Sequence, residues 1–201
     1  MSTGLRPMRQ LSERLVRNLP IPVGDDGLIT AIGEALTEVR ERPVRLREVA
    51  FPHGVASGLW VDRAGHDLIA YEANTDPEHQ RVIIGHEAWH MFHGHCGSAT
   101  IHGAASRAGE DPASSVLADL VAVIAAADDA DPSPTTRTDA LLHFSARADA
   151  REIHEEREAE LFGVRFATDV HAAVAEARTA AGLHNLAERI TASMAHRVRR
   201  F

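Results

Sequence analysis

The sequence has little of what several common classes of protein need. Its 201 residues include one cysteine, Cys96, so no disulfide can form within the chain. Aromatic residues make up only 4%, which disfavours a sandwich of aromatic-rich strands. No segment approaches the roughly 18 to 20 consecutive apolar residues of a transmembrane helix, and arginines interrupt the N-terminal segment where a signal peptide would be apolar. We therefore expect a protein of the reducing cytoplasm.

Positive charge is also scarce. The chain has 21 Lys and Arg against 29 Asp and Glu, a net charge of −8 with histidine neutral. This excess of negative charge repels phosphate backbones and anionic lipids. We therefore expect no direct binding to nucleic acid and none to membranes.

What the chain does contain favours helices. Apolar residues make up 44% of it, and alanine is abundant in the second half, where it promotes close helix packing. We predict one helix-dominated α+β domain over residues 1–201. Its expected parts are two helices in residues 1–43, a small sheet and a central helix in residues 44–97, a helical insert with a flexible loop in residues 98–145, and C-terminal helices in residues 146–201.

Apolar periodicity predicts the first two helices. Leucines at four-residue spacing indicate an amphipathic helix over residues 5–19, ended by Pro20. An apolar stripe over residues 28–39 indicates a second helix, with Asp25 or Asp26 as its cap.

Three short runs predict a small antiparallel sheet. Apolar residues alternate with charged ones from Val44 to Phe51, and two further runs extend from Gly58 to Asp62 and from Asp67 to Tyr71. The short connection between the last two runs predicts a hairpin.

The next predicted helix carries the sequence HEAWH. Thr75 or Asp76 can cap its start, with Pro77 in the first turn, where its missing N–H costs nothing. Gly94 is expected to end it. Further on, we predict a helix over residues 114–127, a proline-rich break over residues 128–138, a long helix from Ala146, and a final helix after Gly182.

The HEAWH segment has the spacing of a metal site. His86 and His90 are four residues apart, so on a helix they lie about 40° apart in azimuth and about 6 Å apart along the axis. Both imidazoles can then converge on one ion, which the ligand type suggests is zinc. Glu87 would lie beside the ion and accept a proton from a water that the metal activates. The alternative is an ordinary helix that carries two histidines.

A catalytic zinc site needs a third protein ligand, and a glutamate-rich segment follows later in the chain. Glu156 and Glu160 share a helix face with Ala159 and Gly163, whose small side chains permit close approach of another helix. We predict Glu156 as the third ligand. Glu160, one turn later, would accept a hydrogen bond from the outward N–H of His86 or His90. The alternative is a solvated run of charges.

These segments together resemble a known family. The sequences EHQRVIIGHEAWHMFHGH and EREAELFGVRFA, with GLW and LIAYE before them, are similar to the ImmA/IrrE family of metallopeptidase domains. The similarity covers residues 44–96 and 152–170, and is closer to the stand-alone actinobacterial members. It implies a zincin-like fold, a zinc cofactor, and a gluzincin-type site in which His86, His90 and Glu156 hold the ion and Glu87 is the base.

The chain departs from the family pattern at three points. Glu160 stands where the family more often has Asn or Asp, the two motifs are further apart than usual, and Thr168 to His171 replace an apolar ending. The wider separation leaves other residues as alternative third ligands: His154, His143 and Glu155.

The resemblance implies zinc-dependent endopeptidase activity on a narrow regulatory substrate, such as a helix-turn-helix repressor or an antitoxin-like partner. Tyr71, at the end of a predicted strand, is a candidate donor to the substrate oxyanion, although packing as a half-buried strand residue is the favoured interpretation. A different class remains open: a zinc-stabilised interaction module that binds a regulator without cutting it. The sequence does not decide the oligomeric state.

Overall fold

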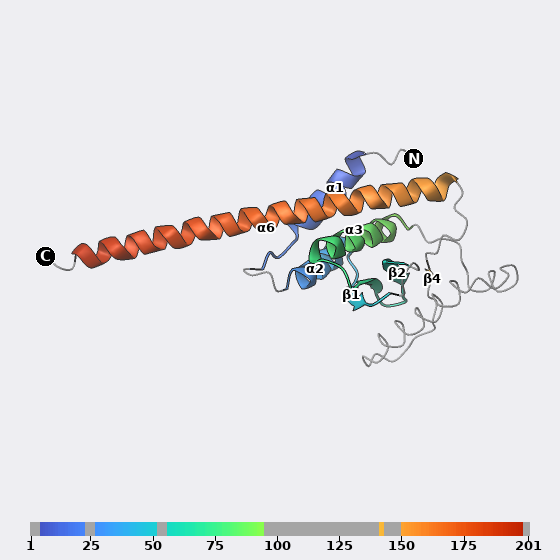
Figure 1. Ribbon diagram of the computed structural model, residues 1–201, viewed down its shortest axis with the longest axis horizontal. Helices are drawn as coiled ribbons and strands as arrows, with labels where there is room; N and C mark the ends of the chain where they lie inside the picture. Colours follow the sequence, from blue (N-terminus) through green and yellow to red (C-terminus); the bar gives the residue numbers. More distant parts are fainter. Residues whose placement is uncertain (1–4, 23–26, 52–55, 95–140, 143–149, 199–201) are drawn as a thin grey trace, which may run out of the picture.

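The computed structural model describes residues 5–22, 27–51, 56–94, 141–142 and 150–198. In this part of the chain the fold is α+β and dominated by helices (Figure 1), as predicted. The elements, in chain order, are α1 (Leu5–Arg17), α2 (Leu28–Arg40), β1 (Val44–Val49), β2 (Gly58–Asp62), β3 (Asp67–Glu72), α3 (Pro77–His93), β4 (Leu141–Leu142) and α6 (Ala150–Val198). None of the helices in the described ranges combines the length and the apolarity that crossing a membrane requires.

The sheet is mixed, whereas the sequence predicted a wholly antiparallel one. Its strand order is β1-β3-β2-β4. The predicted hairpin is confirmed, because β2 and β3 pair antiparallel, but β1 lies parallel to β3. The burial of the strands explains this order. The first five residues of β3 are all buried, which suits a central strand, whereas Arg45 and Glu48 leave β1 suited to an edge.

Helix α3 begins and ends as its sequence predicts. The side chain of Asp76 accepts hydrogen bonds from the backbone N–H groups of Glu78 and His79, and Pro77 occupies the first turn. Gly94 ends the helix with a φ of 61°, in the left-handed region that glycine tolerates best. The helix between these two ends contains the whole HEAWH segment, and its periodicity places His86 and His90 on one face.

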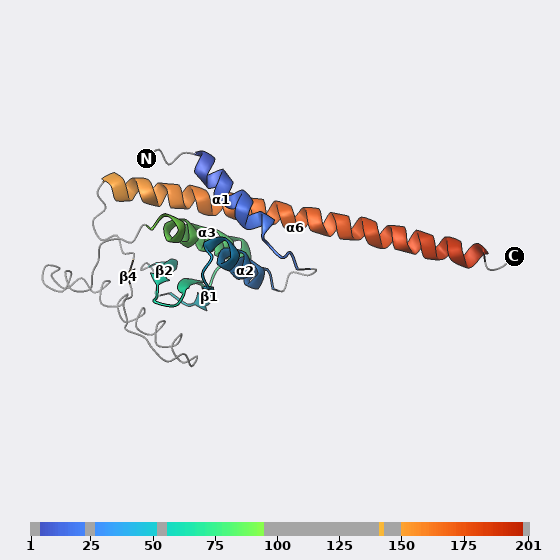
Figure 2. The same cartoon turned by 180° about the vertical axis from the view of Figure 1, so that it is seen from behind.

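Helix α6 is one continuous helix, so the predicted separate helix after Gly182 is wrong. A glycine inside a helix costs only about 1 kcal/mol relative to alanine, and helix-favouring alanines precede this one, so the helix continues. Figures 1 and 2 show α6 running along the whole domain, with α1 crossing one side of it and α3 lying against the other. Its C-terminal part projects beyond the other described elements.

Other predictions have mixed outcomes. The first two helices are confirmed, but the residue that precedes α2 is Gly27, with no side-chain cap. Asp25, Asp26 and the predicted helix and break over residues 114–138 lie outside the described residues.

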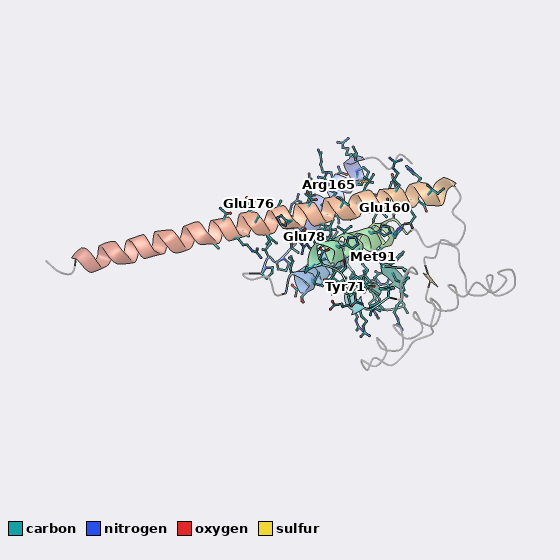
Figure 3. All side chains as sticks on the ribbon, viewed as in Figure 1. Tyr71, Glu78, Met91, Glu160, Arg165 and Glu176 are labelled. Atoms are coloured by element: carbon teal, nitrogen blue, oxygen red, sulfur yellow. The ribbon has the colours of Figure 1, made fainter. Side chains whose placement is uncertain are left out.

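One hydrophobic core joins the helices to the sheet. Trp60 and Ile69 face each other across β2 and β3, and both belong to this core. On its other side Trp89 of α3 packs on Phe162 of α6, with ring centroids 5.0 Å apart. Figure 3 shows the side chains of these elements filling the interior around Met91.

A buried carboxylate anchors the hairpin. Asp67 is fully buried and accepts hydrogen bonds from Trp60 Nε1 at 2.9 Å and from Arg40 Nε at 3.0 Å. Arg42 adds an ion pair at 3.5 Å. Since a buried charge is tolerated only when it is paired, this network holds β2 and Trp60 in place beneath α3.

Candidate metal centre

Three predicted ligands meet at one point between α3 and α6. The two Nε2 atoms of His86 and His90 are 3.1 Å apart. The carboxylate of Glu156 lies across them, 3.3 Å from His86 Nε2 and 3.4 Å from His90 Nε2. Metal–nitrogen bonds of about 2.0 to 2.1 Å at tetrahedral angles separate ligand atoms by about 3.3 to 3.4 Å. The group can therefore hold a metal ion with little rearrangement.

The helix supplies the two rings. His86 and His90 are one turn apart on α3, and their ring centroids lie 4.8 Å apart with an interplanar angle of 60°. His90 is 1% exposed, whereas His86 is only partly buried. One side of the site is thus closed by the core, whereas His86 and Glu156 are partly exposed to solvent on the other side.

Close contact between α3 and α6 places Glu156 next to His86 and His90. A Cβ atom on Gly163 would lie 2.5 Å from the carbonyl oxygen of Val82, and one on Gly85 would lie 3.0 Å from the Cα of Gly163. At Gly163 no side chain fits without movement of the backbone, and at Gly85 a side chain would make unusually tight contacts. The expectation that Gly163 permits close helix approach is confirmed, and this approach brings a carboxylate two turns earlier on α6 to the two rings.

Replacing Gly163 with Ala is therefore expected to lower both the stability of the protein and its affinity for metal. Overpacking costs about 1 to 3 kcal/mol, which exceeds the gain of up to about 1 kcal/mol from the helix propensity of alanine. Gly182→Ala, on the same helix with no atom within 4 Å of the added Cβ, is the matched control and should raise the melting temperature slightly. Thermal unfolding with and without metal measures both effects. Equal stability of the two variants would contradict the argument.

Glu87 lies beside the three ligands in a buried position. It is 8% exposed, and the backbone N–H of Trp60, in β2, donates a hydrogen bond to its carboxylate. Burial and the nearby charge of Glu156 raise the pKa of Glu87 to about 7, against the opposing effects of His86 and of Trp60. A carboxyl group in this range can both take and return a proton near neutral pH.

Negative charge dominates the surroundings of His86. Burial lowers its pKa, but the hydrogen bond to Glu156 and the charges of Glu87, Glu156 and Glu160 outweigh burial and raise it. Carboxylates thus surround two imidazoles at close range. Such a cluster favours a bound cation, because a divalent ion offsets the mutual repulsion of the carboxylates.

Glu160 affects the metal site through its negative charge. It is exposed on α6 (Figure 3), one turn after Glu156, and helps to raise the pKa of His86. The hydrogen bond expected from an imidazole to Glu160 stays a prediction.

Of the alternative third ligands, none joins the group. His154 is 63% exposed in its side chain and lies 3.3 Å from Glu158, its neighbour on α6. Glu155 is next to the ligand in sequence but outside the group, and His143 lies outside the described residues. Among the residues that the structure describes, the set of potential ligands is His86, His90 and Glu156.

Tyr71 is placed in the core. It is 6% exposed on β3, and burial followed by the charge of Glu48 raises its pKa. The cavity that it lines, of about 590 Å³, lies between α2 and β1 and includes none of the metal-site residues. Packing in the strand, the favoured interpretation, agrees with this burial, and the candidate role as a donor to substrate stays a prediction.

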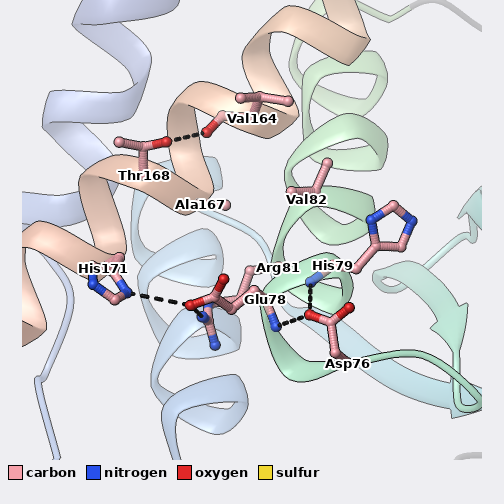
Figure 4. A pocket seen from close by; sticks show the side chains of 9 residues that line it. All are labelled: Asp76, Glu78, His79, Arg81, Val82, Val164, Ala167, Thr168 and His171. Carbon is pink, nitrogen blue, oxygen red and sulfur yellow. Dashed lines mark hydrogen bonds and ion pairs between the residues drawn. The ribbon is translucent and has the colours of Figure 1, made fainter.

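A separate groove of about 500 Å³ lies between the start of α3 and α6 (Figure 4). In it, Glu78 is 3.7 Å from His171 and 3.8 Å from Arg81. Glu78 and His171 are mostly exposed, so these pairs contribute little to stability. None of the candidate metal ligands lines this groove.

The sequence prediction missed the contribution of β2. Gly58 and the backbone of Trp60 contact Glu87, although neither residue type suggests chemistry. The available signal was a glycine inside a predicted strand, which often marks a close approach. Comparison with known proteins adds no assignment to this geometry, since no protein-family model, no curated protein and no solved structure matches the chain.

Proposed function

We propose that this protein is a zinc-dependent endopeptidase whose metal is held by His86, His90 and Glu156. The observation that carries the proposal is the meeting of these three side chains, with ligand atoms 3.1 to 3.4 Å apart, next to the buried carboxylate of Glu87. Two imidazole nitrogens and one carboxylate are a ligand set of catalytic zinc sites, which keep a further position open.

The residues of the chain fit this chemistry. When bound, zinc would polarise a peptide carbonyl and make a water molecule more acidic. Glu87 would remove the proton from that water and pass it to the leaving amine. Burial raises the pKa of this carboxyl group to about 7 in the metal-free protein, which favours its acceptance of the proton. Burial of His90 and Glu87 keeps bulk water from one side of the reaction.

Strand β2 is suited to align an extended substrate. The backbone groups of Ser57 and Arg63 bond toward β3 and its turn, so the alternation of an antiparallel strand directs those of Gly58 and Trp60 to the other side of β2. On that side β4 pairs with Val61 and Asp62, and the N–H of Trp60 bonds to Glu87, so a substrate would pair with the start of the strand at Gly58. Helix α3 lies under this part of β2 at Glu87. A peptide added there as a further strand would have its backbone beside the proposed base.

The substrate class follows from resemblance alone. Residues 78–95 and 156–167 are similar to the ImmA/IrrE family, and on this basis we propose a narrow regulatory substrate, a partner repressor of the helix-turn-helix type, in the cytoplasm. The geometry supports hydrolysis of an extended segment in such a partner, because the candidate base lies beside the start of β2.

Elemental analysis of the purified protein tests the metal. We expect about one zinc per chain, lost in His86→Ala, and a melting temperature that falls when a chelator removes the ion, because a ligand that binds only the folded state stabilises it. His79→Ala is the matched control, since His79 is an exposed histidine on the same helix. Metal-free protein whose stability does not respond to added zinc would overturn the proposal.

A further inference from the structure

Gly58, at the start of β2, leaves room for the proposed base. A Cβ atom at this position would lie 2.7 Å from Glu87 Oε1 and 3.1 Å from Glu87 Cγ. It would also lie 2.6 Å from Cγ2 of Ile83, one turn earlier on α3. Real Cβ atoms do not approach other atoms as closely as 2.6 or 2.7 Å, so any side chain at Gly58 must displace both Glu87 and Ile83 or move the strand.

We propose that Gly58 is a positioning residue for Glu87. Because Gly58 has no side chain, strand β2 packs directly against α3 and holds the carboxylate of Glu87 in one orientation. This inference rests on the proposed function and adds to it a residue that never touches substrate. Its effect passes through Glu87, whose carboxylate accepts the backbone N–H of Trp60 two residues along the same strand.

Backbone conformation does not account for this glycine. Among the described glycines, the positive φ angles occur at Gly27 and Gly94, and Gly58 has ordinary strand geometry that any residue adopts. Glycine inside a strand costs about 0.5 to 1 kcal/mol relative to alanine. The space required by Glu87 and Ile83 is therefore the reason that the structure offers for a glycine here.

Strand β2 cannot retreat to relieve a clash. Trp60 is 2% exposed, and its indole donates to the buried Asp67 at 2.9 Å. Gly58 is also in register with Tyr71 of the central strand. An added methyl group would therefore move the flexible carboxylate of Glu87 more easily than the strand, and a misplacement of about 1 Å can cost about a hundredfold in rate.

The test compares Gly58→Ala with Glu87→Gln and with Ile83→Leu. In metal-free protein, the backbone amide resonance of Trp60 reports its hydrogen bond to Glu87. We expect Gly58→Ala to shift this resonance about as far as Glu87→Gln does. Ile83→Leu, which removes Cγ2 at nearly constant volume, should leave it in place. Zinc content should stay the same in all three variants.

Hydrolysis of labelled, unfolded casein gives the second readout. Gly58→Ala should lower kcat at least about tenfold with little change in KM. In a Glu87→Asp background, where the carboxylate is shorter, the same change should have an effect of less than about twofold, because the two residues act through one contact.

Two results would overturn the inference: an unshifted Trp60 resonance in Gly58→Ala, or full recovery of that resonance when Ile83→Leu is added, which would assign the clash to Ile83. Failure of the proposed function would give a different set of results. In that case the protein lacks zinc, or Glu87→Gln leaves casein hydrolysis unchanged, whatever Gly58→Ala does to the resonance.

Discussion

Glu87→Gln is expected to lower peptide hydrolysis by about a hundredfold to ten-thousandfold, the usual contribution of a general base, while the protein keeps its zinc. Gln has nearly the shape of Glu but cannot accept the proton. The carboxylate is buried against β2 and outside the ligand set of His86, His90 and Glu156, so its loss should not release the ion. Turnover of labelled casein and zinc content of the same preparation measure the two effects.

This variant also separates the proposed enzyme from a zinc-stabilised interaction module. A module that binds a regulator would keep its full activity in Glu87→Gln, because only the metal and the surface matter to it. Glu13→Gln, at an exposed glutamate of α1, controls for loss of charge alone. Equal hydrolysis of labelled casein by the two zinc-loaded variants would contradict the proposed peptidase activity.

Glu156→Ala is expected to weaken zinc binding by about a hundredfold or more, since even residues that merely support a ligand contribute about tenfold to a hundredfold. Glu156 is the one member of the described metal group that comes from α6. Its removal leaves two histidines on one helix, too few for a structural or catalytic zinc site. Competition with a chromogenic chelator measures the affinity.

Neighbouring glutamates supply the controls for this test. Glu160→Ala removes an exposed charge one turn away, and we expect a smaller loss of affinity from it than from Glu156→Ala. Glu155→Ala should have the least effect, because Glu155 is not a member of the metal group. A larger loss in either control would transfer the role of third ligand to that residue.

Local sequence predicted much of the fold. The start of α3 at Asp76 and Pro77 and its end at Gly94 follow from capping and backbone preferences that act within a few residues. The β2–β3 hairpin was predicted because its strands are close in sequence. Spacing of four residues on one helix likewise predicted that His86 and His90 would converge.

Features that depend on distant neighbours were harder to predict. The parallel pairing of β1 with β3 depends on which strand the core buries, and the periodicity of β1 is the same for either direction. The continuation of α6 through Gly182 was missed because a single glycine weakens a helix without ending it.

The sequence by itself determined the pair of histidines and the adjacent glutamate, because a helix places residues four apart on one face wherever it lies in the fold. It also supplied the small residues at the crossing of α3 and α6. Only the tertiary structure decided that Glu156 reaches the two rings and that Gly58 contacts Glu87. Both contacts join elements far apart in the chain or on different layers, and their distances depend on how closely whole helices and strands pack, which no local pattern encodes.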